Sequence, residues 1–69
     1  MNVLLRKIRK QKGMTQDELA KVVGVGRSTI GEIEAGKHIP GVDVAMEIAA
    51  ALHCSVYDIF VISEKEGDE

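Results

Sequence analysis

The stretch GVGRSTIGEIEAGKH, residues 24–38, decides how this chain folds, and three kinds of structure compete for it. Its second half, GEIEAGKH, matches the phosphate-loop pattern G-x-x-x-x-G-K-[ST] except at the last position, where His38 stands. Its first three residues also match the G-x-G with which a dinucleotide-binding turn begins. The third possibility is a helix that follows a tight turn.

Both nucleotide-binding interpretations fail on their surroundings. A phosphate loop needs a flexible glycine turn after a buried strand, and a Ser or Thr after the lysine to hold magnesium. Here residues 32–35, EIEA, favour helix, and their two carboxylates would face the triphosphate. The third glycine of a dinucleotide turn would fall at Thr29, and no strand-forming run precedes Gly24. The stretch therefore favours a helix.

Residues 16–33 have the size pattern of two helices that cross steeply through a short turn. Ala20 is small where the two helices would approach most closely, and Gly24 allows the positive φ that the turn requires. Val25, Ile30 and Ile33 would wedge the pair together. The pattern predicts a helix-turn-helix over about residues 16–35, with the second of its helices at about 26–35.

Three further short helices are predicted around this unit. Leu5 and Ile8, flanked by Val3 and Leu4, mark one face of a first helix that Gly13 can end. A fourth helix opens after residues 40–41 and carries one apolar stripe formed by Val44, Ala45, Ile48, Ala49 and Leu52.

Two capping boxes fix helix starts. Thr15 with Glu18 begins the second helix, and Ser55 with Asp58 begins a short fifth helix that carries Val56, Ile59 and Phe60. We expect an all-α bundle of five helices over residues 1–62, followed by a flexible acidic tail at 63–69. The apolar residues 60–63 would either pack back on the domain as a short strand or pair with a second copy.

Composition limits the class of protein. Sixty-nine residues make one compact unit, and an apolar content of 45% with two aromatic residues is typical of a small helical bundle. Cys54 has no partner for a disulfide or zinc site and is expected to be an inert core residue. With no signal peptide and no membrane span, we expect a cytoplasmic protein without metal or cofactor.

Charge is unevenly distributed, although the net charge is only −2. The first helix is crowded with basic residues, namely Arg6, Lys7, Arg9, Lys10 and Lys12, and the tail with acidic ones, namely Glu64, Glu66, Asp68 and Glu69. The basic run is either a solvated helix face or the end of the molecule that attracts a polyanion, because local field governs such an approach.

The chain resembles the Cro/C1 type of helix-turn-helix domain, also called the xenobiotic-response-element (XRE) family. The resemblance covers about residues 3–60, from IRKQKGMTQDELA to VDVAMEIAAALHCSVYDIF, and the segment GVGRSTIG is similar to the recognition segment of phage lambda repressor. It implies a five-helix, lambda-repressor-like DNA-binding domain. Members of the family are mostly dimeric transcriptional repressors.

The resemblance also implies roles for single residues. Gln16 would bind a DNA phosphate and brace the recognition helix, whereas Lys37 and His38 would contact the DNA backbone from the loop that follows. Arg9 and Glu34 would form an ion pair that ties the first helix to the third. Gly26, Gly41 and Ala35 depart from the family pattern, since they remove two helix caps and a polar side chain.

Helix geometry independently selects the residues that face a DNA groove. A helix inserted by its N-terminus presents positions i, i+1, i+4 and i+5, which here are Arg27, Ser28, Gly31 and Glu32. Arg27 can bind guanine through two hydrogen bonds, and Ser28 can bind a base or a phosphate. Gly31 either lets the backbone approach a base or is a tolerated substitution. Glu32 could accept from cytosine, repel phosphate at wrong sequences, or face solvent beside Lys37.

These observations predict a sequence-specific transcriptional regulator, a dimeric repressor that binds double-stranded DNA at a palindromic operator. The dimer would form through the C-terminal region. The alternative is an antitoxin or adaptor, in which the same fold binds a protein partner; Glu32 and the acidic tail motivate it. An enzyme is not expected, because His38 and His53 have no plausible catalytic partner nearby and a chain of this size lacks a cleft.

Overall fold

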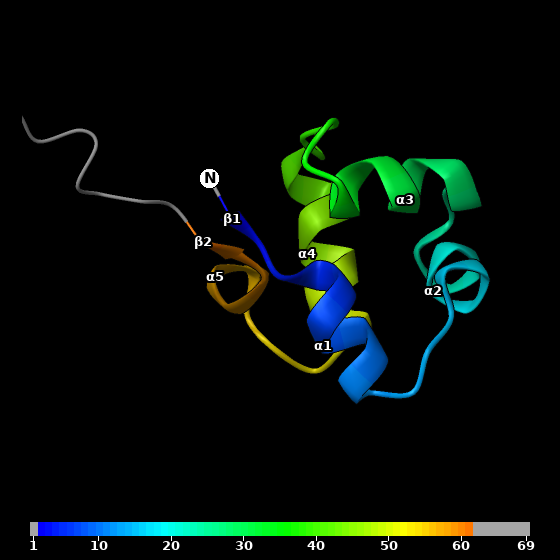
Figure 1. The fold of residues 1–69 in the computed structure, drawn as a ribbon, viewed down its shortest axis with the longest axis horizontal. Helices are drawn as coiled ribbons and strands as arrows, with labels where there is room; N and C mark the ends of the chain where they lie inside the picture. Colours follow the sequence, from blue (N-terminus) through cyan, green and yellow to red (C-terminus); the bar gives the residue numbers. More distant parts are fainter. Residues whose placement is uncertain (1, 62–69) are drawn as a thin grey trace, which may run out of the picture.

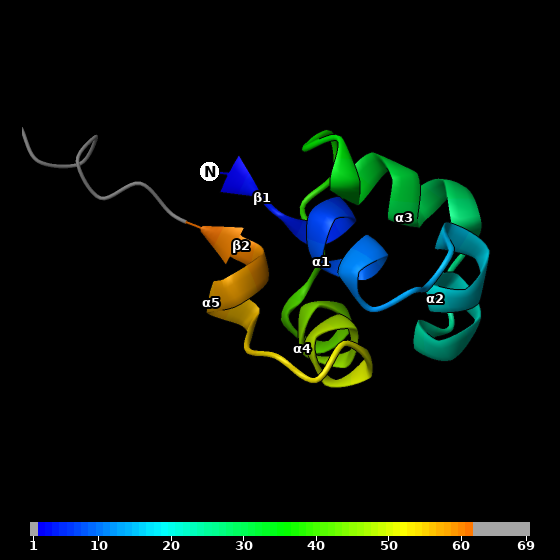
Figure 2. The ribbon, with the colours of Figure 1, turned by 60° about the horizontal axis from the view of Figure 1, so that its bottom comes forward.

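The computed structural model describes residues 2–61, and its helical class confirms the prediction. In chain order the elements are β1 (Asn2–Val3), α1 (Leu5–Gln11), α2 (Gln16–Val23), α3 (Arg27–Glu34), α4 (Val42–Ala51), α5 (Val56–Ile59) and β2 (Phe60–Val61) (Figure 1). Figures 1 and 2 both place α2 and α3 at one end of the domain, and β1, β2 and α5 at the other.

Local sequence signals set the helix ends. The Thr15 hydroxyl accepts from the Glu18 N–H at 3.0 Å, and the Glu18 carboxylate accepts from the Thr15 N–H at 2.9 Å. The same reciprocal pair joins Ser55 and Asp58 at the start of α5. Gly24 ends α2 in the left-handed region with φ of 89°, which a residue with a side chain rarely adopts. Both capping boxes and this turn are as predicted.

The core is apolar and lies where the helices meet. Helix α2 packs against α3 and α4, α1 against α3, and α5 against α4. The buried apolar side chains are Leu5, Leu19, Ala20, Val23, Ile30, Ile33, Ala45, Ile48, Ala49, Leu52, Ile59 and Phe60. Within residues 2–61, every buried side-chain nitrogen or oxygen has a hydrogen-bond partner. Cys54 is half-buried rather than fully enclosed, and burial raises the pKa of its thiol.

A two-stranded antiparallel sheet joins the ends of the described chain. Val3 lies opposite Phe60 and Asn2 opposite Val61, and the Leu4 N–H donates to the Ile59 carbonyl at 2.7 Å. Of the two alternatives for residues 60–63, residues 60 and 61 therefore pack back on their own domain. Ile62, Ser63 and the acidic tail lie outside the described residues.

The N-terminal strand corrects one prediction. Val3 was expected to flank the apolar face of the first helix, but it lies in β1, and Leu4 occupies the N-cap position of α1. The reason is tertiary: β2 offers backbone hydrogen-bonding groups to Asn2 and Val3, which a helix-period analysis of the N-terminus cannot detect.

Residues 2–61 contain no helix with the length and apolar character needed to cross a membrane. Over the same range, no three His, Cys, Asp or Glu side chains gather where they could hold a metal ion.

Candidate nucleic-acid interface

Helix α3 is anchored on one side and exposed on the other. Ile30 and Ile33 are fully buried, so they fix the helix against the core. Arg27 and Ser28, its first two residues, are both exposed, as is Glu32 one turn later. The helix therefore presents its N-terminal turn to the surroundings while its buried side chains prevent it from rotating.

A buried ion pair ties α1 to the C-terminal end of α3. The Arg9 Nε donates to Glu34 Oε2 at 2.6 Å, and Arg9 Nη2 to Glu34 Oε1 at 3.3 Å. The side chains of Arg9 and Glu34 are only 7% and 5% exposed. Arg9 also donates to the Met14 carbonyl at 2.7 Å, which fixes the loop between α1 and α2. This pair is the one that the family resemblance implied.

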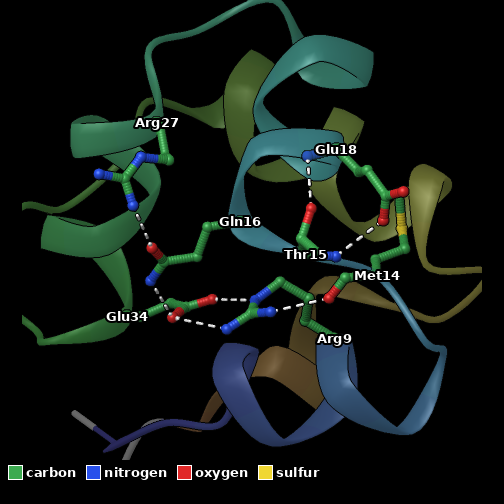
Figure 3. Close-up of polar contacts among 7 residues, drawn as sticks. All are labelled: Arg9, Met14, Thr15, Gln16, Glu18, Arg27 and Glu34. Carbon is green, nitrogen blue, oxygen red and sulfur yellow. Dashed lines mark hydrogen bonds and ion pairs between the residues drawn. The ribbon is translucent and has the colours of Figure 1, made fainter.

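Gln16 connects that ion pair to the exposed end of α3 (Figure 3). Its Nε2 donates to Glu34 Oε1 at 2.9 Å, and its Oε1 accepts from Arg27 Nη1 at 3.5 Å. The second contact is long and therefore weak. A chain of polar contacts thus runs from Arg9 through Glu34 and Gln16 to the exposed guanidinium of Arg27.

The same residues line an open hollow of about 590 Å³ between α1, the start of α2 and α3. We call it the α1–α3 hollow; its lining residues are Arg6, Arg9, Lys10, Met14, Thr15, Gln16, Asp17, Arg27, Gly31, Glu34 and Ala35. Three of the residues predicted to contact DNA, Gln16, Arg27 and Gly31, are therefore brought together in one place.

The other predicted contact residues lie outside the hollow. Ser28, Glu32, Lys37 and His38 are exposed and do not line it. Lys37 and His38 follow Gly36, whose φ of 79° turns the chain away from the end of α3. Within residues 2–61 no ion pair joins the Glu32 and Lys37 side chains, although the Lys37 N–H donates to the Glu32 carbonyl at 2.9 Å.

Gly31 is not required by the fold itself. A Cβ added there would lie 3.8 Å from Gln16 Nε2, which is an ordinary van der Waals distance. A methyl group therefore fits in the free protein, so packing within the fold does not account for a glycine at this position.

Sequence reasoning did not assign Arg6 and Lys10 to this site. Both are exposed and line the hollow from α1, with Arg9 between them on the same face. The spacing i, i+3, i+4 could have grouped the three side chains. The interpretation of the whole basic run as a solvated face is wrong for Arg9, because that side chain is buried against Glu34.

The chain is similar to known helix-turn-helix proteins in sequence. The family model described as Helix-turn-helix matches residues 5–59. An uncharacterized HTH-type transcriptional regulator of Archaeoglobus fulgidus is 41% identical over 66 residues, which span 96% of this chain and 94% of that protein.

Two solved structures are similar as well. The restriction-modification controller protein C.AhdI from Aeromonas hydrophila has a TM-score of 0.75 and 32% identity, over 81% of this chain and 85% of its own. The biofilm master regulator SinR, in complex with DNA, has a TM-score of 0.71 and 31% identity, over 77% and 86% of the two chains. These similar proteins are regulators and not enzymes.

Proposed function

This chain belongs to the Cro/C1-type helix-turn-helix family of DNA-binding transcriptional regulators, and from that premise we propose that it is a dimeric, sequence-specific repressor. It binds a palindromic operator in the cytoplasm, and it inserts α3 into the major groove. The observation that carries this proposal is the exposed N-terminal turn of α3, held by buried Ile30 and Ile33 and braced by Gln16.

The proposed contacts divide into bases and backbone. Arg27 and Ser28 meet base edges first, because they are the first two residues of the inserted helix. Arg27 binds guanine O6 and N7, a contact worth about 1–3 kcal/mol of discrimination against a wrong base. When it does so it gives up its 3.5 Å contact with Gln16, which is weak enough to be exchanged.

The remaining proposed contacts either add affinity for DNA or exclude wrong base sequences. Gln16 reaches a phosphate from the start of α2, and Lys37 and His38 reach the backbone from the loop after α3. Gly31 allows close approach of the α3 backbone. Glu32 is exposed one turn beyond Ser28, where it accepts from cytosine N4 or repels a wrong sequence.

Charge distribution supports this placement of DNA. Residues 2–37 contain eight Lys or Arg and four Asp or Glu, whereas residues 38–61 contain no Lys or Arg and three acidic residues. The half of the chain that carries α1, α2 and α3 is therefore the half that attracts a polyanion, despite the overall charge of −2.

An apolar surface on the other half supports the dimer. A hollow of about 210 Å³ is lined by Ile39, Pro40, Val42, Ala45, Met46, Val56 and Phe60, all apolar. Val42 is 76% exposed and Met46 is 59% exposed, which is unusual for large apolar side chains gathered at one place. A second copy would cover this surface and set two copies of α3 about 34 Å apart, one turn of DNA.

The first test selects DNA from random duplexes. Wild type should enrich a palindromic motif at low salt, whereas Arg27→Ala should lose the preference at one position of each half-site. Arg27→Lys is the matched variant, because it keeps the charge but cannot bind guanine through two parallel hydrogen bonds. Failure of the wild type to enrich any motif would overturn the proposed function.

The second test measures the mass of the protein in solution. Val42→Glu should shift the dimer to monomer by burying a charge in the interface. Val22→Glu is the control, because Val22 is also exposed, at 61%, but lies on α2 away from the apolar hollow. A wild type that is monomeric at all concentrations would contradict the dimer.

The same apolar surface favours one second function, an adaptor or antitoxin that binds another protein. In that case Val42→Glu would lose the partner and Arg27→Ala would keep it. Arg27→Ala separates the two functions, because a DNA reader would lose its sequence preference with the same change.

A further inference from the structure

We propose that α1 forms a second part of the DNA interface, in which Arg6 and Lys10 bind the phosphodiester backbone alongside the helix-turn-helix. This inference rests on the proposed function and extends it, because it assigns a role to a helix that is outside the two-helix reading unit. It identifies the α1–α3 hollow as the place where the DNA backbone lies.

Helix geometry aims these two side chains at the hollow. Arg6, Arg9 and Lys10 share one face of α1, because residues three and four apart are neighbours on a helix. Arg9 is fixed by Glu34 of α3, so its direction sets the direction of that face. Arg6 and Lys10 on either side of it remain exposed and line the hollow opposite α3.

The hollow is positive once internal pairs are subtracted. Of its two carboxylates, Glu34 is paired with buried Arg9, and exposed Asp17 lies 3.4 Å from Lys21 in a surface ion pair. Even with Asp17 counted in full, the lining carries four cations, namely Arg6, Arg9, Lys10 and Arg27, against two carboxylates. Within residues 2–61, Arg6 and Lys10 form no ion pair, and Arg27 is held only by the long contact with neutral Gln16. Three cations therefore face a space large enough for a phosphate and its sugar.

DNA geometry brings a backbone to this position. The major groove is about 12 Å wide, and a helix with its side chains is about 10–12 Å across, so an inserted helix has a sugar-phosphate wall along its flank. The hollow lies on the α1 flank of α3, beside Arg27 and Gly31. Small residues in its lining, Gly31 and Ala35, leave room for the wall to approach.

Binding of this kind has a measurable signature. A phosphate contact releases counterions and carries no sequence information, so its loss weakens all duplexes alike and lowers the salt slope by about 0.9 per contact. Base-reading residues behave differently, since their loss changes the ratio between operator and random DNA.

The experiment compares four glutamine variants by fluorescence anisotropy on the selected operator and on a random duplex, from 50 to 200 mM salt. Arg6→Gln and Lys10→Gln remove the proposed contacts. Lys7→Gln and Lys12→Gln are matched controls, because both residues are exposed and near or within α1 but neither lines the hollow. Glutamine is a good helix former, so the helix should be kept in all four, which circular dichroism checks.

For Arg6→Gln and Lys10→Gln we expect the salt slope to fall by about 0.9 each. Because wild type then loses affinity more steeply with salt, the ratio of wild-type to variant affinity should shrink about threefold from 50 to 200 mM salt. The operator-to-random ratio should stay constant. The two controls should keep the wild-type slope.

Equal slopes for all four variants, or a wild-type slope in Arg6→Gln and Lys10→Gln, would overturn the inference while leaving the α3 assignment intact. A changed operator-to-random ratio in Arg6→Gln or Lys10→Gln would also overturn it, since it would place base reading on α1. If wild type binds neither duplex, the proposed function itself is wrong, and that result is distinct from every outcome above.

Discussion

At the scale of single residues, the Arg9–Glu34 pair determines how firmly α3 is held. Both partners are buried, and Glu34 also accepts from Gln16, so its carboxylate accepts three hydrogen bonds from two side chains. Removing one charge from such a pair is far more damaging than removing both, because the remaining charge stays buried without compensation.

We therefore expect Arg9→Met to lower the free energy of unfolding by about 3–5 kcal/mol. The double variant Arg9→Met, Glu34→Met should recover most of that loss, since no unpaired charge is left in the site. Urea denaturation of the two variants measures the difference. Equal destabilisation of the single and double variants would show that the loss comes from packing rather than from the orphaned carboxylate.

Gly31 is the opposite case, because a glycine within a helix lowers the stability of the fold and no packing contact in the fold requires it. Gly31→Ala should stabilise the protein by about 1 kcal/mol, because alanine is the better helix former and its methyl group meets no clash. We expect operator affinity to fall at the same time, since the methyl group would stand where α3 approaches the DNA. Thermal unfolding and anisotropy on one sample measure both effects.

Ala50→Gly is the reciprocal control for that prediction. Ala50 is exposed on α4, so the change should destabilise by a similar amount without altering operator affinity. Unchanged affinity in Gly31→Ala would assign the glycine to tolerance rather than to DNA approach.

At the scale of elements, the helices differ in how their first turns are secured. The N-cap of α2 and of α5 carries a reciprocal capping box, whereas Gly26 and Gly41, the N-caps of α3 and α4, provide no side-chain hydrogen bond. The four-residue helix α5 depends most on its cap, because so short a helix has little stability of its own.

The α5 cap gives stability a pH dependence. Hydrogen bonds from the Ser55 backbone, and then the Ser55 side chain, hold the pKa of Asp58 below its ordinary 3.8. A carboxyl group whose pKa is lower in the folded state stabilises the fold at pH values above its unfolded-state pKa. This stability is lost as the pH falls through the folded-state pKa. Melting temperature should therefore drop below about pH 3.8.

The variant Asp58→Asn separates this carboxylate from the other acids that titrate in the same window. Its melting curve, followed from pH 5 to pH 2, should fall less steeply than that of wild type. Parallel curves for the two proteins would mean that the α5 cap does not depend on the charge of Asp58.

At the scale of the whole molecule, the β1–β2 pair joins the two ends of the described chain. Within residues 2–61 the Lys and Arg residues all lie in the half that carries α1, α2 and α3. Val3 is half-buried against the core, and its strand holds β2 directly after α5. Since α5 also packs on α4, the sheet secures the end of the molecule opposite α3.

Deleting residues 1–3 should lower the free energy of unfolding by about 1–2 kcal/mol, from lost backbone pairing and part of the burial of Val3. Val3→Thr is the companion variant, because threonine keeps the strand but removes apolar contact. Chemical denaturation should rank the deletion as the more destabilising of the two. An unaffected deletion would show that α5 and β2 need no support from β1.

The sequence by itself determined the helices and the turn, because their signals are local. The capping boxes, the glycine at position 24 and the spacing of Ile30 and Ile33 each act within a few residues, and all lie where they were predicted. The Arg9–Glu34 pair was foreseen through family resemblance, since its partners are 25 residues apart and no local rule joins them.

Only the tertiary structure decided what lies between distant segments. It paired Val3 with Phe60, enclosed Arg9 rather than leaving it in a solvated face, and set Arg6 and Lys10 across a hollow from Arg27. The physical reason is common to all three. Backbone pairing, burial of a charge and the convergence of cations depend on how elements pack, and periodicity within one element carries no information about its neighbours.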